Sequence, residues 1–180
     1  HVPSSWISLA CFGVIGFLSI LNFIFKNRNL LLINQNLAPI GLMFAIISIV
    51  TGSLWGQPTW GTWWAWDARL ASMLVLGIFY LFYIITWKII LNYKLANRIS
   101  SLIAIIGLIN LPIIKYSVDW WSTLHQSSSV KIVSTTTIHF SILLPLMIMF
   151  STLVLYAFLI FLMKYKTEII KLKNKGLDRI

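Results

Sequence analysis

Tryptophan is concentrated in one short stretch of the chain, and its spacing there favours a large, flat, apolar ligand. Five of the nine tryptophans lie within residues 55–70, namely Trp55, Trp60, Trp63, Trp64 and Trp66. If residues 60–67 are helical, positions i, i+3, i+4 and i+7 share one face, and these are Trp60, Trp63, Trp64 and Asp67. Gly61 weakens the helical alternative, so a loop remains open. The helical face is a broad aromatic surface with a carboxylate at its edge, which suits a planar ligand at a membrane surface.

Tryptophan also gathers at membrane interfaces whatever a protein does, because its ring is amphipathic. Two or three such residues need no further explanation. Five of them, interrupted by glycine and proline and followed by aspartate, exceed what an interfacial belt requires. We therefore interpret residues 52–69 as a ligand-binding segment.

Three histidines are candidate metal ligands. His1 precedes the first apolar run, His125 lies in a later polar segment, and His139 stands at the start of the last apolar run. An iron porphyrin needs an aromatic or apolar wall and one or two axial nitrogen ligands. His1 and His125 come from the segments that flank the tryptophan stretch, so we interpret them as the axial pair. His139 is a spare that can instead cap a helix or form a hydrogen bond within the bundle.

Each charged residue considered near the tryptophans has two possible roles. Asp67 stands where an apolar run begins, so it can stabilise a helix N-terminus, or orient a ring N–H or a cation beside a porphyrin. Arg69, together with Lys115 and Lys131, can neutralise the two propionates of a haem. The simpler alternative for the two lysines is contact with lipid phosphate.

The composition indicates an integral membrane protein. Of the 180 residues, 59% are hydrophobic and 10% are charged, and the mean hydropathy is +0.88. No soluble domain of this size needs that much apolar surface. The formal net charge of +10 comes from basic residues between and after the apolar runs, which is typical of membrane topology and argues against a nucleic-acid partner.

Motifs for covalent haem attachment and for catalysis are missing from the sequence. Cys11 is the single cysteine, so neither an intramolecular disulfide nor a C-x-x-C-H motif exists. There is no Walker-type glycine-rich loop, no H-E-x-x-H and no G-x-S-x-G. Four acidic residues in all leave few groups for acid–base chemistry. Nothing in the sequence therefore indicates an enzyme.

The apolar runs predict an all-α membrane bundle that forms a single domain over residues 1–180. Five spans are expected, at about residues 6–25, 37–54, 70–91, 99–114 and 138–163. An earlier start of the second span, within residues 30–33, is the alternative. Pro39 is acceptable in a first helical turn, which favours the later start. Pro112 is expected to kink or end the fourth span, and an outer loop follows from Lys115 to Thr137.

The basic residues predict which ends of the spans face the cytoplasm. Lys26, Arg28, Lys88, Lys94, Arg98 and the six cations of residues 164–180 fall at inner boundaries or in a basic cytoplasmic tail. The tail is expected to contact anionic lipid. The tryptophan stretch and all three histidines then lie on the outer side. With an N-terminus inside, one further span is expected before His1, which makes six in the intact chain.

The tryptophan stretch also resembles a known signature. Trp60-Gly61-Thr62-Trp63-Trp64-Ala65-Trp66-Asp67 fits the W-G-x-x-W-x-W-D pattern of the tryptophan-rich haem-handling proteins of cytochrome c biogenesis. Three further segments resemble the haem exporter protein C (CcmC) family: Asp67-Ala68-Arg69-Leu70, His1-Val2-Pro3 and Trp121-Ser122-Thr123-Leu124-His125-Gln126. One small departure is Ala71-Ser72, where Thr-Ser is common. The likeness covers nearly the whole chain.

This resemblance implies six membrane spans and a tryptophan-rich segment that holds haem b, without a covalent bond, on the periplasmic or intermembrane-space side. It implies axial ligands that match His1 and His125. It also implies partners, namely the A and B subunits of an ATP-binding-cassette transporter, a small D subunit and a membrane-tethered haem chaperone, the E protein. The chain would present haem to that chaperone, in the bacterial inner membrane or in the mitochondrial one.

The alternative is a catalytic haem-lyase subunit that attaches haem to apocytochrome c. The larger lyase subunits read W-D-P-x-E after the tryptophans, and this chain does not. The residues that we expect to contact haem are Trp55, Trp60, Gly61, Trp63, Trp64, Trp66, Asp67 and Arg69, and the expected iron ligands are His1 and His125.

Overall fold

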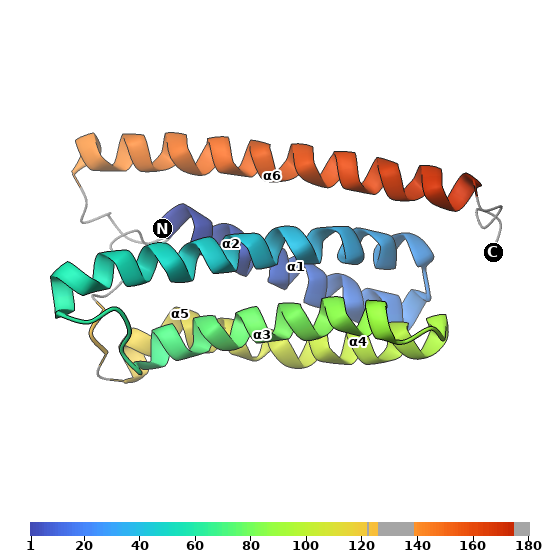
Figure 1. The fold of residues 1–180 in the computed structure, drawn as a ribbon, viewed down its shortest axis with the longest axis horizontal. Coiled ribbons are helices and arrows are strands. Elements are labelled where there is room, and N and C mark those ends of the chain that lie inside the picture. Colours follow the sequence, from blue (N-terminus) through green and yellow to red (C-terminus); the bar gives the residue numbers. More distant parts are fainter. Residues whose placement is uncertain (122, 126–138, 175–180) are drawn as a thin grey trace.

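The computed structural model describes residues 1–121, 123–125 and 139–174, and within these ranges all regular structure is helical. Its helices are α1 (Val2–Phe25), α2 (Arg28–Trp60), α3 (Ala68–Ile89), α4 (Tyr93–Leu108), α5 (Asn110–Trp120) and α6 (Phe140–Asn174) (Figure 1). In this described part, five helical stretches are long and apolar enough to cross a membrane, and α4 and α5 together make one of them. The expected all-α bundle with five spans is therefore confirmed.

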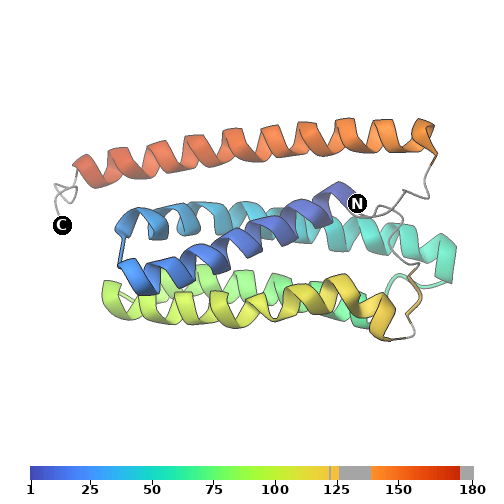
Figure 2. The same ribbon diagram turned by 180° about the vertical axis from the view of Figure 1, so that it is seen from behind.

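The connections between helices gather at two ends of the bundle. The N-terminus, the α2–α3 connection, the end of α5 and the start of α6 lie at one end, which we call the tryptophan end (Figures 1 and 2). The α1–α2 and α3–α4 connections lie at the other end, with the end of α6. We call this the basic end, because Lys26, Arg28, Lys88 and Lys94 stand at the helix termini there. The helices thus alternate in direction as the sequence predicts.

Hydrogen bonds between polar side chains hold α1 against its neighbours near the basic end. Asn34 of α2 donates to the Ile15 carbonyl oxygen and to the Ser19 hydroxyl, each at 3.1 Å. Asn22 Nδ2 donates to Asn97 Oδ1 of α4 at 2.8 Å. Lipid tails are as apolar as leucine, so the hydrophobic effect alone associates membrane helices weakly. Such bonds, together with close packing, therefore specify how this bundle assembles.

Tyr80 of α3 links the first three helices closer to the middle of the bundle. Its hydroxyl donates to the Ser8 carbonyl oxygen at 2.7 Å, and its ring packs edge-on against Phe12 with centroids 4.9 Å apart. Gly41 of α2 makes room for it, because a Cβ there would lie 2.1 Å from the Tyr80 hydroxyl oxygen. This packing fixes the position of α3, whose N-terminus is capped by Asp67.

Helix α2 is longer than predicted. Its favoured start near residue 37 is wrong, and the helix begins before even the earlier alternative at residues 30–33. It begins at Arg28, where the Asn27 side chain accepts a hydrogen bond from Asn29 N at 2.9 Å and caps the helix. Pro39 lies inside the helix instead of in its first turn. Membrane helices tolerate such a proline because neighbouring helices and polar side chains satisfy the freed backbone groups. The buried Asn34 does not interrupt the helix, because its side-chain amide donates a hydrogen bond to α1.

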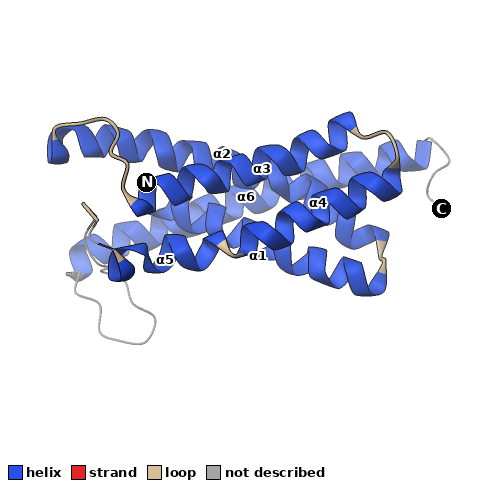
Figure 3. Ribbon diagram, turned by 90° about the horizontal axis from the view of Figure 1, so that it is seen from below, coloured by secondary structure: helices blue, strands red, loops and turns tan. Residues whose placement is uncertain are grey.

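The last two spans also differ from the predicted boundaries. The helix of the fourth span is interrupted at Ile109, between α4 and α5. The proline at position 112 predicts this interruption, because its ring clashes with the backbone carbonyl four residues earlier. Helix α5 then continues to Trp120. The prediction that a loop begins at Lys115 is therefore wrong for residues 115–120. Short loops join α1 to α2, α2 to α3 and α3 to α4 (Figure 3). Helix α6 runs on through Asn174 and includes the first part of the basic tail. Ile138, Lys175 and Arg179 lie outside the described residues.

Gly61 ends α2 in a conformation that favours glycine, and this predicts a measurable cost on substitution. Its φ is +74°. Gly61→Ala is expected to destabilise the protein by about 1 kcal/mol, because a left-handed conformation crowds the Cβ of L-residues. Gly77→Ala is the matched control, since its added Cβ meets nothing within 4 Å; it should be neutral or stabilising. Unfolding midpoints in one detergent test this. Equal midpoints for Gly61→Ala and wild type would contradict it.

Candidate functional site

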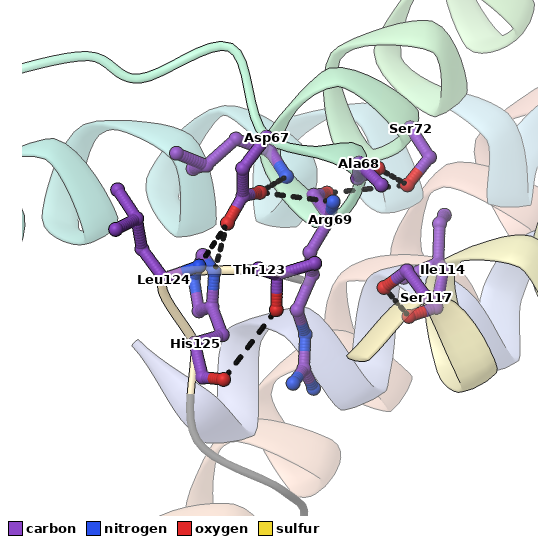
Figure 4. Close-up of polar contacts among 10 residues, drawn as sticks. Asp67, Ala68, Arg69, Ser72, Ile114, Ser117, Thr123, Leu124 and His125 are labelled. Atoms are coloured by element: carbon purple, nitrogen blue, oxygen red, sulfur yellow. Dashed lines mark hydrogen bonds and ion pairs between the residues drawn. The ribbon is translucent and has the colours of Figure 1, made fainter. Parts of the chain in front are cut away.

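Asp67 joins the start of α3 to the segment after α5. One carboxylate oxygen, Oδ1, accepts hydrogen bonds from Arg69 N and Leu70 N, both at 2.9 Å, and so caps α3 (Figure 4). The other, Oδ2, accepts from His125 Nδ1 at 2.9 Å and from Leu124 N at 3.2 Å. One oxygen thus caps the helix and the other holds a ring N–H, which are the two contacts weighed for this residue.

The surroundings of Asp67 favour its ionised form. Partial burial by itself raises the pKa of Asp67, but hydrogen bonds from Leu70 N, His125 and Leu124 N together bring the pKa below its ordinary value of 3.8. The carboxylate therefore contributes to stability at neutral pH. This contribution is lost as the pH falls below 3.8 towards the lower pKa of the folded state.

The His125 ring is held in a defined orientation. Its side chain is 16% exposed. Because its Nδ1 faces the Asp67 carboxylate, Nδ1 carries the proton and donates it. The Trp60 ring lies edge to face against it, with centroids 4.8 Å apart. Among the residues that the structure describes, Nε2 has no hydrogen-bond partner. In the neutral ring, Nε2 is therefore the unprotonated nitrogen.

His1 is seated against α2 by a backbone acceptor. Its Nδ1 donates to the Ser48 carbonyl oxygen at 2.8 Å and lies 3.3 Å from Thr51 Oγ1. Gly52 allows this close approach, because a Cβ there would lie 2.9 Å from His1 Cε1. As at His125, the hydrogen bond at Nδ1 fixes the tautomer and leaves Nε2 without a hydrogen-bond partner in the described ranges.

Of the two alternatives for residues 60–67, the loop is present and the helix is not, so the condition for one flat tryptophan face is not met. Helix α2 ends at Trp60, and residues 61–67 form a loop, because Gly61 adopts a positive φ that turns the chain out of the helix. The rings meet edge to face instead. Trp55 contacts Trp60 with centroids 5.2 Å apart, and Trp64 contacts Trp66 with centroids 5.5 Å apart. Trp63 is 59% and Trp66 80% exposed, so these two present apolar surface at the tryptophan end.

Two side-chain donors of this segment, on Trp64 and Arg69, form no hydrogen bond with a described residue. Trp64 Nε1 is buried and makes no hydrogen bond to any described residue. The Arg69 guanidinium has electrostatic attraction to Asp67 and Asp119 but no hydrogen bond in the described part of the chain. The tryptophan end also has an open cavity of about 480 Å³. It is lined by Ala65, Trp66, Asp67, Ala68, Trp121, Thr123 and Leu124. The arrangement suits a partly apolar ligand with anionic groups.

The other predicted residues either form contacts elsewhere or lie outside the described part of the chain. His139 is exposed, and its Nδ1 lies 2.8 Å from Ser141 Oγ and accepts a hydrogen bond from Ser141 N at the start of α6. This is the capping role considered for it. The exposed Lys115 has its ammonium 5.3 Å from the centre of the Tyr116 ring. Lys131, the third cation proposed for the propionates, lies outside the described residues.

Two glycines of α2 belong to the site and were missed by sequence reasoning. Gly52 admits the His1 ring, and Gly56, one turn later, admits Trp60, whose Cε3 would lie 3.1 Å from a Cβ at that position. The Ser48 carbonyl oxygen was also missed, since a backbone acceptor has no side-chain signature. The i, i+4 spacing of the glycines just before the tryptophans was the one available signal, because small residues mark close approach between helices.

These features define a class, namely an all-helical membrane protein with a tryptophan-rich segment and two oriented histidines at one end. A family profile described as heme exporter protein C matches residues 1–179. The chain belongs to this family, so the resemblance found in the sequence is confirmed.

Individual relatives agree with this assignment. A heme exporter protein C from Bradyrhizobium diazoefficiens is 37% identical over 178 residues, which cover 99% of this chain and 68% of that protein. The Escherichia coli K12 heme exporter protein C is 43% identical over 129 residues, covering 72% of this chain and 53% of the relative. A ccmC-like mitochondrial protein of cytochrome c biosynthesis from Marchantia polymorpha is 40% identical over 152 residues, covering 84% and 64% respectively. The chain thus spans between about half and two thirds of the length of these relatives.

Proposed function

We propose that this chain binds haem b without a covalent bond at its tryptophan end. The observation that carries the proposal is the state of two histidines. His1 and His125 each donate from Nδ1 to an oxygen, so that in the neutral ring Nε2 is the unprotonated nitrogen and can bind iron. Metal-binding histidines typically have their second nitrogen held in this way, by a carboxylate or a backbone carbonyl. Asp67 supplies the first kind of partner and Ser48 the second.

The other groups around the histidines suit the rest of a porphyrin. Trp64 Nε1 and the Arg69 guanidinium are donors that would pair with the propionates, and this would satisfy the buried indole N–H. Trp55, Trp60, Trp63 and Trp66, with the turn at Gly61, would supply the apolar wall. Residues 52–69 are therefore the proposed haem-binding segment.

We infer that the role is to present haem rather than to transform it. The chain would hold haem for a membrane-tethered chaperone, the E protein, during maturation of c-type cytochromes. The transporter A and B subunits and the small D subunit are its proposed partners in a haem export complex. ATP hydrolysis by the transporter is the proposed driver of release, because the sequence contains no nucleotide-binding motif.

The positive-inside rule supports an orientation for this complex. It would place the basic end, with the tail of residues 164–180, on the cytoplasmic or matrix side, and the tryptophan end on the opposite side. The host membrane would be a bacterial inner membrane or a mitochondrial inner membrane.

Haem co-purification and transfer test this proposal. Protein produced with and without the chaperone is assayed for bound haem from its absorption, and purified haem-free chaperone is then added. Haem is expected to accumulate when the chaperone is absent and to leave when it is added. Trp66→Leu should lower the haem content, because Trp66 is 80% exposed at the site. Trp6→Leu is the control, since Trp6 packs against Phe150 of α6 instead. Haem-free wild-type protein under both conditions would contradict the proposal.

A further inference from the structure

The two candidate histidines differ in the charge of the group that accepts their ring proton. His125 Nδ1 donates to a carboxylate oxygen of Asp67 at 2.9 Å. His1 Nδ1 donates to the backbone carbonyl oxygen of Ser48 at 2.8 Å, and that carbonyl carries no net charge. Because the two hydrogen bonds have nearly the same length, the charge of the acceptor is what distinguishes the two rings.

A negatively charged acceptor makes its histidine the stronger metal ligand. A carboxylate attracts the Nδ1 proton and so raises the basicity of Nε2. The side chains of His125 and Asp67 are 16% and 8% exposed, so solvent and salt screen this interaction weakly. The Ser48 carbonyl lies inside α2, where a helical carbonyl also accepts from the N–H four residues later. It therefore raises the basicity of His1 much less.

The backbone at both histidines is held, so backbone anchoring does not separate them. The His1 carbonyl oxygen accepts from Ser5 N at 3.0 Å in the first turn of α1. Leu124 N, just before His125, donates to the same Asp67 oxygen as the ring, at 3.2 Å. The carboxylate of Asp67 is in turn fixed as the cap of α3. The difference between the two candidate ligands is therefore electronic.

Given the haem site proposed above, we propose that its two axial positions are unequal. His125 is the ligand that stays on the iron, and His1 is the ligand that an incoming donor of the haem acceptor replaces. In this exchange the bond from His1 Nε2 to iron breaks and one bond from the incoming donor forms, with no electron transferred. Asp67 is thus a positioning residue that decides which ligand leaves, and His125 retains the haem until the acceptor has bound.

Cyanide added to the full chain loaded with ferric haem shows which histidine stays. The infrared C–N stretch of bound cyanide depends on the ligand on the opposite face of the iron. His1→Gly gives the reference spectrum with His125 opposite cyanide, and His125→Gly gives the one with His1 opposite. Wild type is expected to match His1→Gly. A match to His125→Gly, or an equal mixture of both, would overturn the proposal. Wild-type protein that binds no haem would instead contradict the proposed function.

Thr51 allows a second test with both histidines in place. Its Oγ1 lies 3.3 Å from His1 Nδ1, so Thr51→Asp brings a carboxylate to the ring that lacks one. Cyanide should then replace His1 about tenfold more slowly than in wild type, because the two rings become alike. Thr51→Asn is the matched control, since it has the same shape without the charge, and His1 should remain the ligand that exchanges. Equal exchange rates in wild type and Thr51→Asp would overturn the proposal.

Discussion

Replacing His1 or His125 with glycine is expected to weaken haem binding by more than about 100-fold. Loss of a group that merely orients a metal ligand costs about 10- to 100-fold in affinity, and loss of the ligand itself removes an iron–nitrogen bond outright. Added imidazole should restore much of the loss, because the glycine leaves a space that the free ring can enter. Haem titration with and without imidazole measures both effects.

Two further variants make this prediction specific. Gly52→Ala keeps His1 but places a Cβ 2.9 Å from its ring, so the ring must move and affinity should fall by a smaller factor, without rescue by imidazole. His139→Gly should leave affinity unchanged, because His139 forms its hydrogen bonds at the start of α6. If His139→Gly weakened binding and His125→Gly did not, the ligand assignment would be wrong.

Asp67→Asn is expected to weaken haem binding by about 10- to 100-fold while keeping the cap of α3. The asparagine oxygen can still accept from Arg69 N and Leu70 N. Its amide nitrogen then faces Leu124 N and His125 Nδ1. All three groups are hydrogen-bond donors, so neither bond to Oδ2 can be replaced. His125 therefore loses the acceptor that fixes its tautomer. Haem titration and unfolding midpoints, measured on one preparation, separate the two roles.

Asp67→Ala removes the cap as well and should cost about 1 kcal/mol more in stability than Asp67→Asn. The control is Asp119→Asn, which makes the same charge change at an exposed residue near the end of α5. In a His125→Gly background, Asp67→Asn should have no further effect on affinity, because the ring it orients is gone. An undiminished effect of Asp67→Asn in that background would show that it acts through another group.

The number and alternating direction of the apolar helices were predictable because they depend on quantities that the sequence carries directly. Long apolar runs set the number of spans, and basic residues such as Lys26 and Lys94 mark the connections between them. The helix boundaries were less predictable. Pro39 suggests a helix start when read alone, yet contacts between helices hold α2 continuous across it. Tertiary packing therefore overrode the local signal.

Residue type alone identified the candidate ligands but could not predict how they are oriented. The sequence singles out His1, His125 and Asp67, and it allows two roles for the aspartate. It does not show that one carboxylate can perform both roles at once. The tryptophans do not form one flat helical face, because Gly61 has a positive φ and ends α2 at Trp60. A regular helical period does not apply beyond such a turn.

We propose that the Nε2 atoms of His1 and His125 bind one haem iron, and the absorption spectrum of haem-loaded protein tests this binding most directly. Wild type is expected to give a low-spin spectrum typical of two imidazole ligands. His1→Gly and His125→Gly should each change this to a spectrum with one protein ligand, and imidazole should reverse the change. A wild-type spectrum that persists unchanged in both variants would contradict the account, because the iron would then be held by other residues.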